Sequence, residues 1–445
     1  MNTPICDFIK QYAKRDILRL HMPGHKGKNQ LGFEELDITE FNGADSLYHA
    51  SGIIKKSEDN VTALFESGKT LYSTEGSSHC IRTMLHLAKQ YTGKNYVLAG
   101  RNAHSSFISA CALNDIDVEW LYPEENESYL SCTISPEKLK KALTRVDKTP
   151  ICVYITSPDY LGNMCDIKAL AKTCRDFGTM LVVDNAHGAY LKFLDNDMHP
   201  ISLGATMCCD SAHKTLPVLT GGAYLHISKG APSFFKENAK DVMALFGSTS
   251  PSYLTLQSLD MANKYIANGY KEKLNEFVTH LHNAFSDFEF CTLHFAHTLC
   301  EPMKIVLKTK KIGYRGGDFA KILEEKGVMC EFCDDDFAVL MPSVENGIYE
   351  IEKLKGILLS IPPKPPISEE KACFTPPSKK MSIREAVFAP KEMIKINNAL
   401  GRILATSSVS CPPAVSLIVC GEEFNQSTIE LCKKYGFDSF WVVKK

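Results

Sequence analysis

The stretch ICVYITSPDYLGNMCDIKALAKTCRDFGTMLVVDNA, residues 151–186, has the pattern of a strand, a helix and a second strand. Its two ends are apolar runs without alternation, which is typical of strands buried on both faces of a parallel sheet. Between them, apolar residues recur at helical spacing from Ile167 to Cys174, after Asp166 as an N-cap and before Gly178 as a stop. The stretch therefore predicts a parallel sheet with crossover helices.

The same alternation continues on both sides of this stretch. The apolar runs YVLAG (96–100) and AYLHI (223–227) are further strand candidates. A helix is predicted from Ser77 to Gly93, because apolar residues at positions 81, 84, 85 and 88 fall on one face. The expected fold class is α/β, with a mostly parallel central sheet, helices on both of its faces and a smaller α+β C-terminal region.

Composition shifts along the 445 residues predict several regions. Proline and charge crowd residues 361–385, which is typical of a linker. The predicted regions are an N-terminal segment (1–70), a large cofactor-binding domain (71–274), a small-domain region (275–360), a proline-rich linker (361–382) and a C-terminal module (383–445).

Charge and composition exclude several classes of partner. The net charge is −2 and the pI is about 6.7, so no basic field exists to hold nucleic acid or an anionic membrane. No apolar stretch approaches the ~20 residues of a membrane span, and the N-terminus lacks a signal-peptide core. We expect a cytoplasmic protein with a small-molecule partner, no metal site, and 17 cysteines that are mostly reduced and buried.

Lys214 lies in the segment DSAHKT (210–215), between an apolar run and the pair Gly221-Gly222. A lysine at the edge of a buried sheet can be partly desolvated, which lowers its pKa and frees the amine to condense with an aldehyde. A solvated loop lysine is the alternative interpretation.

Asp184 ends the strand MLVVD, and the carboxyl ends of strands in open α/β sheets face the ligand crevice. A carboxylate there can pair with a pyridine nitrogen and keep it protonated. Gly76, Ser77 and Ser78 open the predicted helix, where backbone N–H groups and hydroxyls attract a phosphate. A plain helix cap is the alternative interpretation of Asp184, and it is the simpler one for the serines, because serine is a common N-cap that needs no ligand.

The order and the spacing of the serines near residue 76, Asp184 and Lys214 make a shared ligand site more probable than any one of them does alone. Lys214 follows Asp184 by 30 residues, which is one βαβ unit, so both side chains can reach one crevice. With S-x-H-K around the lysine, this order resembles the aspartate-aminotransferase fold, or fold type I, of pyridoxal-phosphate enzymes.

A narrower resemblance covers nearly the whole chain. The following segments look like the Orn/Lys/Arg decarboxylase family, in that order: HMPGHKG (21–27), DITEFNGADSL (37–47), GRNAHSS (100–106), DNAHGAYLKF (184–193), SAHKTLPVLTGGAYLH (211–226), STSPSYLTLQSLD (248–260) and REAVFAPKE (384–392). SAHKTLP together with DNAHG is the most specific part.

The resemblance implies pyridoxal 5'-phosphate as the cofactor, held as a Schiff base by Lys214. Asp184 would bind the pyridine nitrogen, His104 would stack on the ring, and His187 would lie near its hydroxyl edge. The remaining cofactor contacts would come from Gly76, Ser77, Ser78, Ala186, Ser211, His213 and, across a homodimer interface, Ser248 or Thr249.

The implied reaction is decarboxylation of a basic amino acid to an amine of the polyamine pathway. Glu422, or its neighbour Glu423, is a candidate for meeting the distal cation of the substrate. Departures from the family pattern at Gly100, Ser105, Asn185 and Gly221 leave the choice among arginine, lysine and ornithine open. The long N-terminal wing domain of the largest members is not expected.

Three other functions remain open from the sequence. The first is an aminotransferase or aldolase on the same scaffold. The second is a metal-dependent hydrolase that uses Asp184, His187 and His213. The third is a catalytically idle protein that only binds the cofactor.

Overall fold

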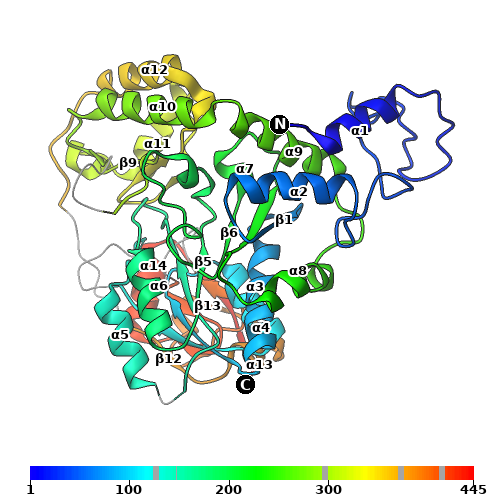
Figure 1. Ribbon diagram of the computed structural model, residues 1–445. Coiled ribbons are helices and arrows are strands. Elements are labelled where there is room, and N and C mark those ends of the chain that lie inside the picture. Colours follow the sequence, from blue (N-terminus) through cyan, green and yellow to red (C-terminus); the bar gives the residue numbers. More distant parts are fainter. Residues whose placement is uncertain (124–129, 147, 293–298, 369–374, 410–415) are drawn as a thin grey trace. The chain divides into compact units, whose positions relative to one another are not determined.

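The computed structural model describes residues 1–445 except 124–129, 147, 293–298, 369–374 and 410–415 (Figure 1). It divides into two compact units. The first comprises Met1–Lys94, Ile151–Ser157 and Ile167–Lys273, and the second comprises Asn95–Pro150, Pro158–Asp166 and Leu274–Lys445. Each unit is described by itself.

The first unit contains a sheet of buried, mostly apolar strands. Its strand order is β1 (Lys69–Ser73), β7 (Ala223–Ile227), β6 (Met207–Asp210), β5 (Leu181–Asp184) and β4 (Val153–Thr156). Strands β4, β5 and β6 are parallel, as the continuous apolar runs predict. Strand β7 is antiparallel to both β6 and β1. The connection from β6 to β7 contains only the four-residue helix α7 (Ala212–Thr215). A parallel strand would need a longer crossover helix between the two strands, so β7 runs antiparallel to β6.

The helices of this unit are α1 (Pro4–Ala13), α2 (Ile53–Leu64), α3 (Gly76–Thr92), α6 (Ile167–Asp176), α8 (Ser233–Phe246) and α9 (Tyr253–Ala267), with a short 3-10 helix η1 (Ala189–Phe193). Helix α3 has the predicted face, since its residues 81, 84, 85 and 88 are buried. Gly93 ends it with φ 67°, a left-handed conformation that favours glycine. Helices α3 and α8 lie side by side, and α1, α2 and α9 pack together (Figure 1).

The second unit begins with the parallel pair β2 (Tyr96–Gly100) and β3 (Asp117–Leu121), connected by α4 (Ser105–Asn114) and followed by α5 (Pro136–Arg145). Helix α10 (Tyr270–Phe285) runs into this unit. A four-stranded antiparallel sheet follows, formed by β8 (Cys291–Thr292), β9 (Ile305–Leu307), β10 (Phe332–Cys333) and β11 (Ala338–Leu340), with α11 (Gly316–Glu325), α12 (Gly347–Leu359) and the 3-10 helices η2 (Thr309–Ile312) and η3 (Val344–Asn346).

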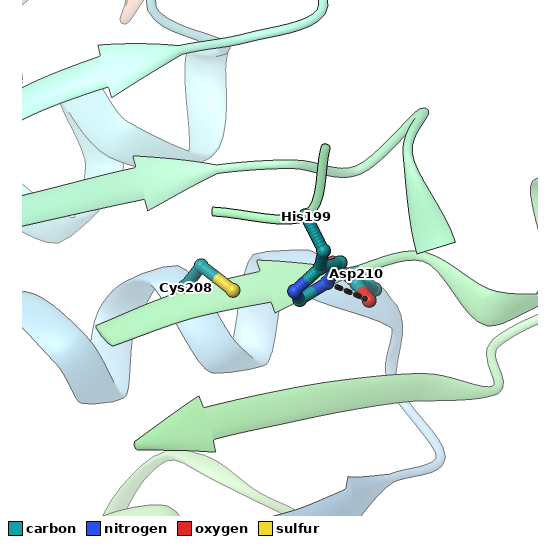
Figure 2. A group of neighbouring side chains, drawn as sticks. All are labelled: His199, Cys208 and Asp210. Atoms are coloured by element: carbon teal, nitrogen blue, oxygen red, sulfur yellow. Dashed lines mark hydrogen bonds and ion pairs between the residues drawn. The ribbon is translucent and has the colours of Figure 1, made fainter. Parts of the chain in front are cut away.

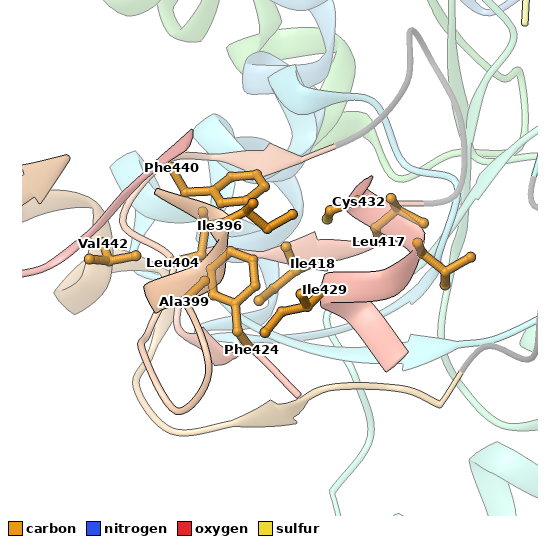
Figure 3. Packing of buried hydrophobic residues seen from close by; sticks show 11 residues of the cluster. Ile396, Ala399, Leu404, Leu417, Ile418, Phe424, Ile429, Cys432, Phe440 and Val442 are labelled. Atoms are coloured by element: carbon orange, nitrogen blue, oxygen red, sulfur yellow. The ribbon is translucent and has the colours of Figure 1, made fainter. Parts of the chain in front are cut away.

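The C-terminal part of the second unit has short strands around its own apolar core. Its elements are β12 (Ser378–Lys379), α13 (Ile383–Phe388), β13 (Lys391–Lys395), η4 (Ile396–Asn398), β14 (Ser408–Val409), β15 (Ile418–Val419), β16 (Glu422–Glu423), α14 (Gln426–Lys434) and β17 (Ser439–Val443). Phe424 and Phe440 lie 4.9 Å apart between ring centroids, among Leu404, Ile418 and Ile429 (Figure 3). This buried cluster supports the predicted α+β character of the region.

Other expectations have mixed outcomes. All cysteines among the described residues are free and most are buried, as predicted. None of the described helices is both long and apolar enough to cross a membrane. The linker prediction over 361–382 falls partly on residues 369–374, which lie outside the described residues, and the predicted domain boundaries stay predictions.

Candidate active site

The carboxyl ends of the parallel strands β4, β5 and β6 present Thr156, Asp184 and Asp210. These ends share one edge of the sheet, which is where α/β proteins bind ligands. The loops that leave this edge contain His187 after β5 and Lys214 after β6. The two features that the sequence singles out are therefore neighbours in the first unit.

The Asp184 carboxylate is buried, with 2% of the residue exposed, and its direction is set by three donors. The Tyr154 hydroxyl donates to Oδ2 at 3.1 Å. The Ala186 backbone N–H donates to Oδ1 at 3.2 Å, and the Cys209 thiol lies 3.7 Å from the same oxygen. Asp184 thus forms a turn with its own loop and caps no helix, so the plain helix-cap interpretation is wrong.

The Lys214 amine lies in hydrogen-bonding contact with the loop that follows Asp184. Its Nζ is 2.9 Å from Nε2 of His187, which is itself buried. Lys214 is exposed as a residue, and the partial desolvation of its amine stays a prediction.

The start of helix α3 has the features of an anion site. Gly76 adopts φ 71° and donates its N–H to the Gly221 carbonyl at 2.7 Å. The Ser211 hydroxyl donates to Ser77 Oγ at 2.9 Å, which brings the loop before Lys214 to the helix. No side chain among the described residues caps this helix, and a Cβ at Gly76 would meet nothing within 4 Å. The first turn of α3 therefore has no side-chain cap and has open space at Gly76, which suits an anion at a helix N-terminus.

The other predicted phosphate contacts lie around this helix start. Ser78 is in its first turn. His213 Nδ1 lies 2.9 Å from the Gly222 carbonyl, which fixes the ring. The Ser248 N–H donates to Oε1 of Glu75 of the same chain at 2.6 Å, and Thr249 follows it on the surface. A contribution of Ser248 or Thr249 across a subunit interface stays a prediction.

A buried carboxylate that the sequence did not single out connects the two site loops. Asp210 Oδ2 lies 3.0 Å from Nε2 of His199 (Figure 2). The same oxygen lies 3.0 Å from Nε2 of His226, and Oδ1 accepts from Asn185 Nδ2 at 2.7 Å. All of these side chains are fully buried. Asn185 follows Asp184, and Asp210 precedes Ser211, so the Asp210 carboxylate connects the loop after β5 with the loop after β6.

The ionisation of this network follows from its hydrogen bonds. The Ile201 N–H donates to His199 Nδ1 at 3.4 Å, so Nε2 of that ring carries the proton given to Asp210. Burial raises the pKa of Asp210. The electrostatic attraction to His199 and His226 and the hydrogen bonds from both rings outweigh this effect, and they hold the pKa well below its usual range. Burial also lowers the pKa of His226. The network therefore consists of an ionised aspartate and a neutral His226.

His199, Cys208 and Asp210 bring ligand atoms within 4.8 Å of one another, a spacing that could hold a metal ion (Figure 2). The hydrogen bonds above already use the facing atoms of His199 and Asp210, and burial keeps the Cys208 pKa well above its usual value, so the thiol is protonated. Among the residues that the structure describes, Asp184, His187 and His213 form no such group, which removes the structural basis of the metal-hydrolase alternative.

The neutral His226 predicts how stability depends on pH. In the unfolded chain its pKa returns to about 6.5. Below that pH the unfolded chain binds a proton that the folded protein lacks, so the free energy of unfolding falls as pH decreases. His226→Gln is expected to make this fall shallower between about pH 7 and about pH 5 in urea unfolding. Asp210 does not confound the comparison, since its unfolded pKa is about 3.9.

The exposed His49 provides the matched control for this experiment. His49→Gln is expected to keep the wild-type pH dependence, while His226→Gln loses part of it. Equal slopes for wild type and His226→Gln would show that His226 is not held neutral in the folded protein.

His104 belongs to the second unit, where it is the N-cap of α4. Its Nδ1 accepts the Ser106 N–H at 3.2 Å and lies 2.8 Å from the Ser106 hydroxyl. The hydrogen bond assigns the proton to Nε2 and fixes the ring plane. Stacking of this ring on a cofactor stays a prediction.

Glu422 also belongs to the second unit, and its carboxylate is occupied. Its two oxygens accept from Nη1 and Nη2 of Arg101 at 2.6 and 2.7 Å, and Oε2 also accepts the Val419 N–H at 2.8 Å. Arg101 is completely buried. This bidentate pair argues against Glu422 as the partner of a substrate cation, because meeting that cation would strand a buried guanidinium.

Comparisons with known proteins agree with this geometry. The family model "Orn/Lys/Arg decarboxylase, major domain" matches residues 3–289. An arginine decarboxylase of Bacillus subtilis is 26% identical over 96% of this chain and 92% of its own length. The uncharacterized protein YaaO of the same organism is 25% identical over 97% and 93%, respectively.

Solved structures show the same fold at low sequence identity. Lysine decarboxylase A from Pseudomonas aeruginosa aligns with a TM-score of 0.80 at 17% identity, covering 99% of this chain and 80% of that chain. A serine palmitoyltransferase from Sphingomonas wittichii aligns with a TM-score of 0.56 at 15% identity, covering 81% and 83%. These likenesses confirm the predicted fold type I. The chain belongs to the Orn/Lys/Arg decarboxylase family, whose members are pyridoxal-phosphate-dependent amino-acid decarboxylases.

Proposed function

We propose that this protein decarboxylates a basic amino acid, namely arginine, lysine or ornithine, with pyridoxal 5'-phosphate bound at Lys214. The observation that carries the proposal is the contact between the Lys214 amine and His187, three residues beyond the buried Asp184 carboxylate. A nucleophilic amine, a base and an acidic group thus meet at one strand edge.

The residues of the first unit fit the cofactor at both of its ends. The open N-terminus of α3, with Gly76, Ser77 and Ser211, suits a phosphate. Asp184 suits a protonated ring nitrogen, because its carboxylate is buried and oriented by neighbouring donors. When bound, pyridoxal phosphate supplies an electron sink for the pair left by the departing carboxyl group.

The side chains of this chain then have distinct tasks. His187 accepts a proton from the Lys214 ammonium, which leaves the amine neutral and nucleophilic. The Asp184 carboxylate, oriented by Tyr154 and the Ala186 N–H, would hold the ring nitrogen of the cofactor. The Asp210 network keeps both loops in place, so that little reorganisation is needed.

The substrate class rests on the relatives, since arginine decarboxylases and lysine decarboxylases are among them. The Arg101 pairing of Glu422 removes that carboxylate from consideration, and Glu423 lies 3.5 Å from the Lys380 amine. We expect the protein to act as a homodimer or higher homo-oligomer and to be located in the cytoplasm.

A panel assay tests the proposal. Purified protein with pyridoxal phosphate is incubated separately with arginine, lysine and ornithine, and agmatine, cadaverine, putrescine and carbon dioxide are measured. We expect one amine to form in equal amount with carbon dioxide. Formation of a keto acid without carbon dioxide would instead identify an aminotransferase, and cofactor binding without any product would identify an idle binding protein.

A further inference from the structure

The Tyr154 hydroxyl is the donor to Oδ2 of Asp184, and the proposed reaction gives it no role so far. We infer that Tyr154 is a positioning residue that sets the direction and the basicity of the Asp184 carboxylate toward the cofactor. The inference rests on the proposed function. It concerns the first unit alone, because both residues lie in it.

Strand register explains how the two side chains meet. In the parallel pair β4 and β5, Tyr154 lies opposite Val182 and Thr156 lies opposite Asp184. Side chains two residues apart on a strand share a face, so Tyr154 and Asp184 are diagonal neighbours. A side chain as long as tyrosine is needed to cover that diagonal, and the hydroxyl then reaches the carboxylate at 3.1 Å.

Because both side chains are buried, this hydrogen bond matters for the ionisation of the carboxylate. Tyr154 is fully buried and Asp184 nearly so, and a carboxylate out of water requires donors to stay ionised. The other side-chain donor, the Cys209 thiol at 3.7 Å, is a weak one. Tyr154 is thus the strong side-chain donor seen on this carboxylate, and it acts on the oxygen that the Ala186 N–H leaves open.

Two measurable consequences follow from losing the hydroxyl. The carboxylate becomes free to rotate, so it pairs less well with the ring nitrogen and cofactor affinity falls. Without this donor the negative charge of the Asp184 carboxylate is also less compensated. A more strongly negative carboxylate raises the pKa of a protonated nitrogen on the bound cofactor. A purely structural hydrogen bond would change neither quantity.

The chain offers a matched control in Tyr224, on strand β7 of the same sheet. Tyr224 is also fully buried, but its hydroxyl has no hydrogen-bond partner among the residues that the structure describes. Tyr154→Phe and Tyr224→Phe therefore delete the same atom from the same kind of environment. Only the first deletion removes a donor from Asp184.

The experiment compares wild type, Tyr154→Phe and Tyr224→Phe by three measurements. These are the dissociation constant of pyridoxal phosphate from the apo-protein, the midpoint of the pH titration of the visible band of the bound cofactor, and urea unfolding. For Tyr154→Phe we expect affinity to fall about 10-fold, as for a hydrogen bond to a charged group, and the midpoint to move to higher pH. Tyr224→Phe is expected to match wild type in both.

Each outcome decides the inference. Tyr154→Phe with the affinity and the midpoint of Tyr224→Phe overturns it, even if unfolding shows a loss of stability, because the bond would then be structural only. Wild-type protein that binds no pyridoxal phosphate overturns the proposed function itself. The wild-type arm therefore separates the two failures.

Discussion

Lys214→Ala is expected to abolish amine formation, with turnover at least about 1000-fold below wild type, because no other residue in the loop supplies the nucleophile. The contact between Nζ and His187 positions this amine, and the alanine side chain removes it altogether. Carbon dioxide release from the preferred substrate measures the effect. The visible absorbance of the bound cofactor should change with it.

The control for this variant is an exposed lysine of the same unit. Lys168 lies on the exposed side of helix α6, and Lys168→Ala is expected to keep wild-type turnover and absorbance. Urea unfolding should show both variants folded, since Lys214 is exposed and packs little apolar surface. Turnover by Lys214→Ala close to wild type would remove this lysine from the reaction.

Glu422→Gln is expected to lower the free energy of unfolding by about 3–5 kcal/mol, because it leaves the buried Arg101 guanidinium without its counter-charge. Burial lowers the pKa of Arg101, and the Glu422 carboxylate more than offsets this, so the arginine stays charged. The guanidinium also lies 5.0 and 5.4 Å from the ring centroids of Trp120 and Tyr122, and the residue has no exposed surface.

The neighbouring glutamate provides the control. Glu423 is partly exposed and lies 3.5 Å from Lys380, so Glu423→Gln should change the free energy of unfolding by less than about 1 kcal/mol. The double variant Arg101→Met/Glu422→Met removes both charges and should recover much of the lost free energy of unfolding. If Glu422→Gln keeps wild-type stability but raises the KM of a basic substrate, Glu422 is a substrate residue and the structural interpretation is wrong.

Local sequence patterns predict several elements of both units well. The runs 96–100 and 223–227 form β2 and β7 with those bounds, and the helical face of α3 is buried as expected. Such elements depend on periodicity and on end signals within one segment, which a sequence displays directly. The direction of β7 was not predictable in this way, because it depends on the length of the connection after β6.

Long-range partners explain what the sequence did not reveal at the site. Asp210 lies in the apolar run MCCD, and its charge there was the only signal of a buried network. Its partners His199, His226 and Asn185 come from three other segments, and no spacing rule connects them. Tyr154 was likewise indistinguishable from a core residue until the register of β4 and β5 was known.

Glu422 shows the opposite error. The family resemblance suggested Glu422, in the segment CGEEF, as a partner for a substrate cation, but the resemblance carried no information about which side chain the fold places opposite it. Arg101 is separated from it by 321 positions, and only the folded second unit shows that the two side chains satisfy one another. The local sequence does not distinguish an exposed glutamate from a buried one.

The central claim is that one amine, on Lys214, holds the cofactor beside Asp184. Borohydride reduction in the presence of pyridoxal phosphate fixes the cofactor covalently to the lysine that holds it, and peptide mapping by mass spectrometry then locates the label. We predict the label on the peptide that contains Lys214, with none there in Lys214→Ala. A label on any other lysine of wild type, with Lys214 unmodified, would contradict the account.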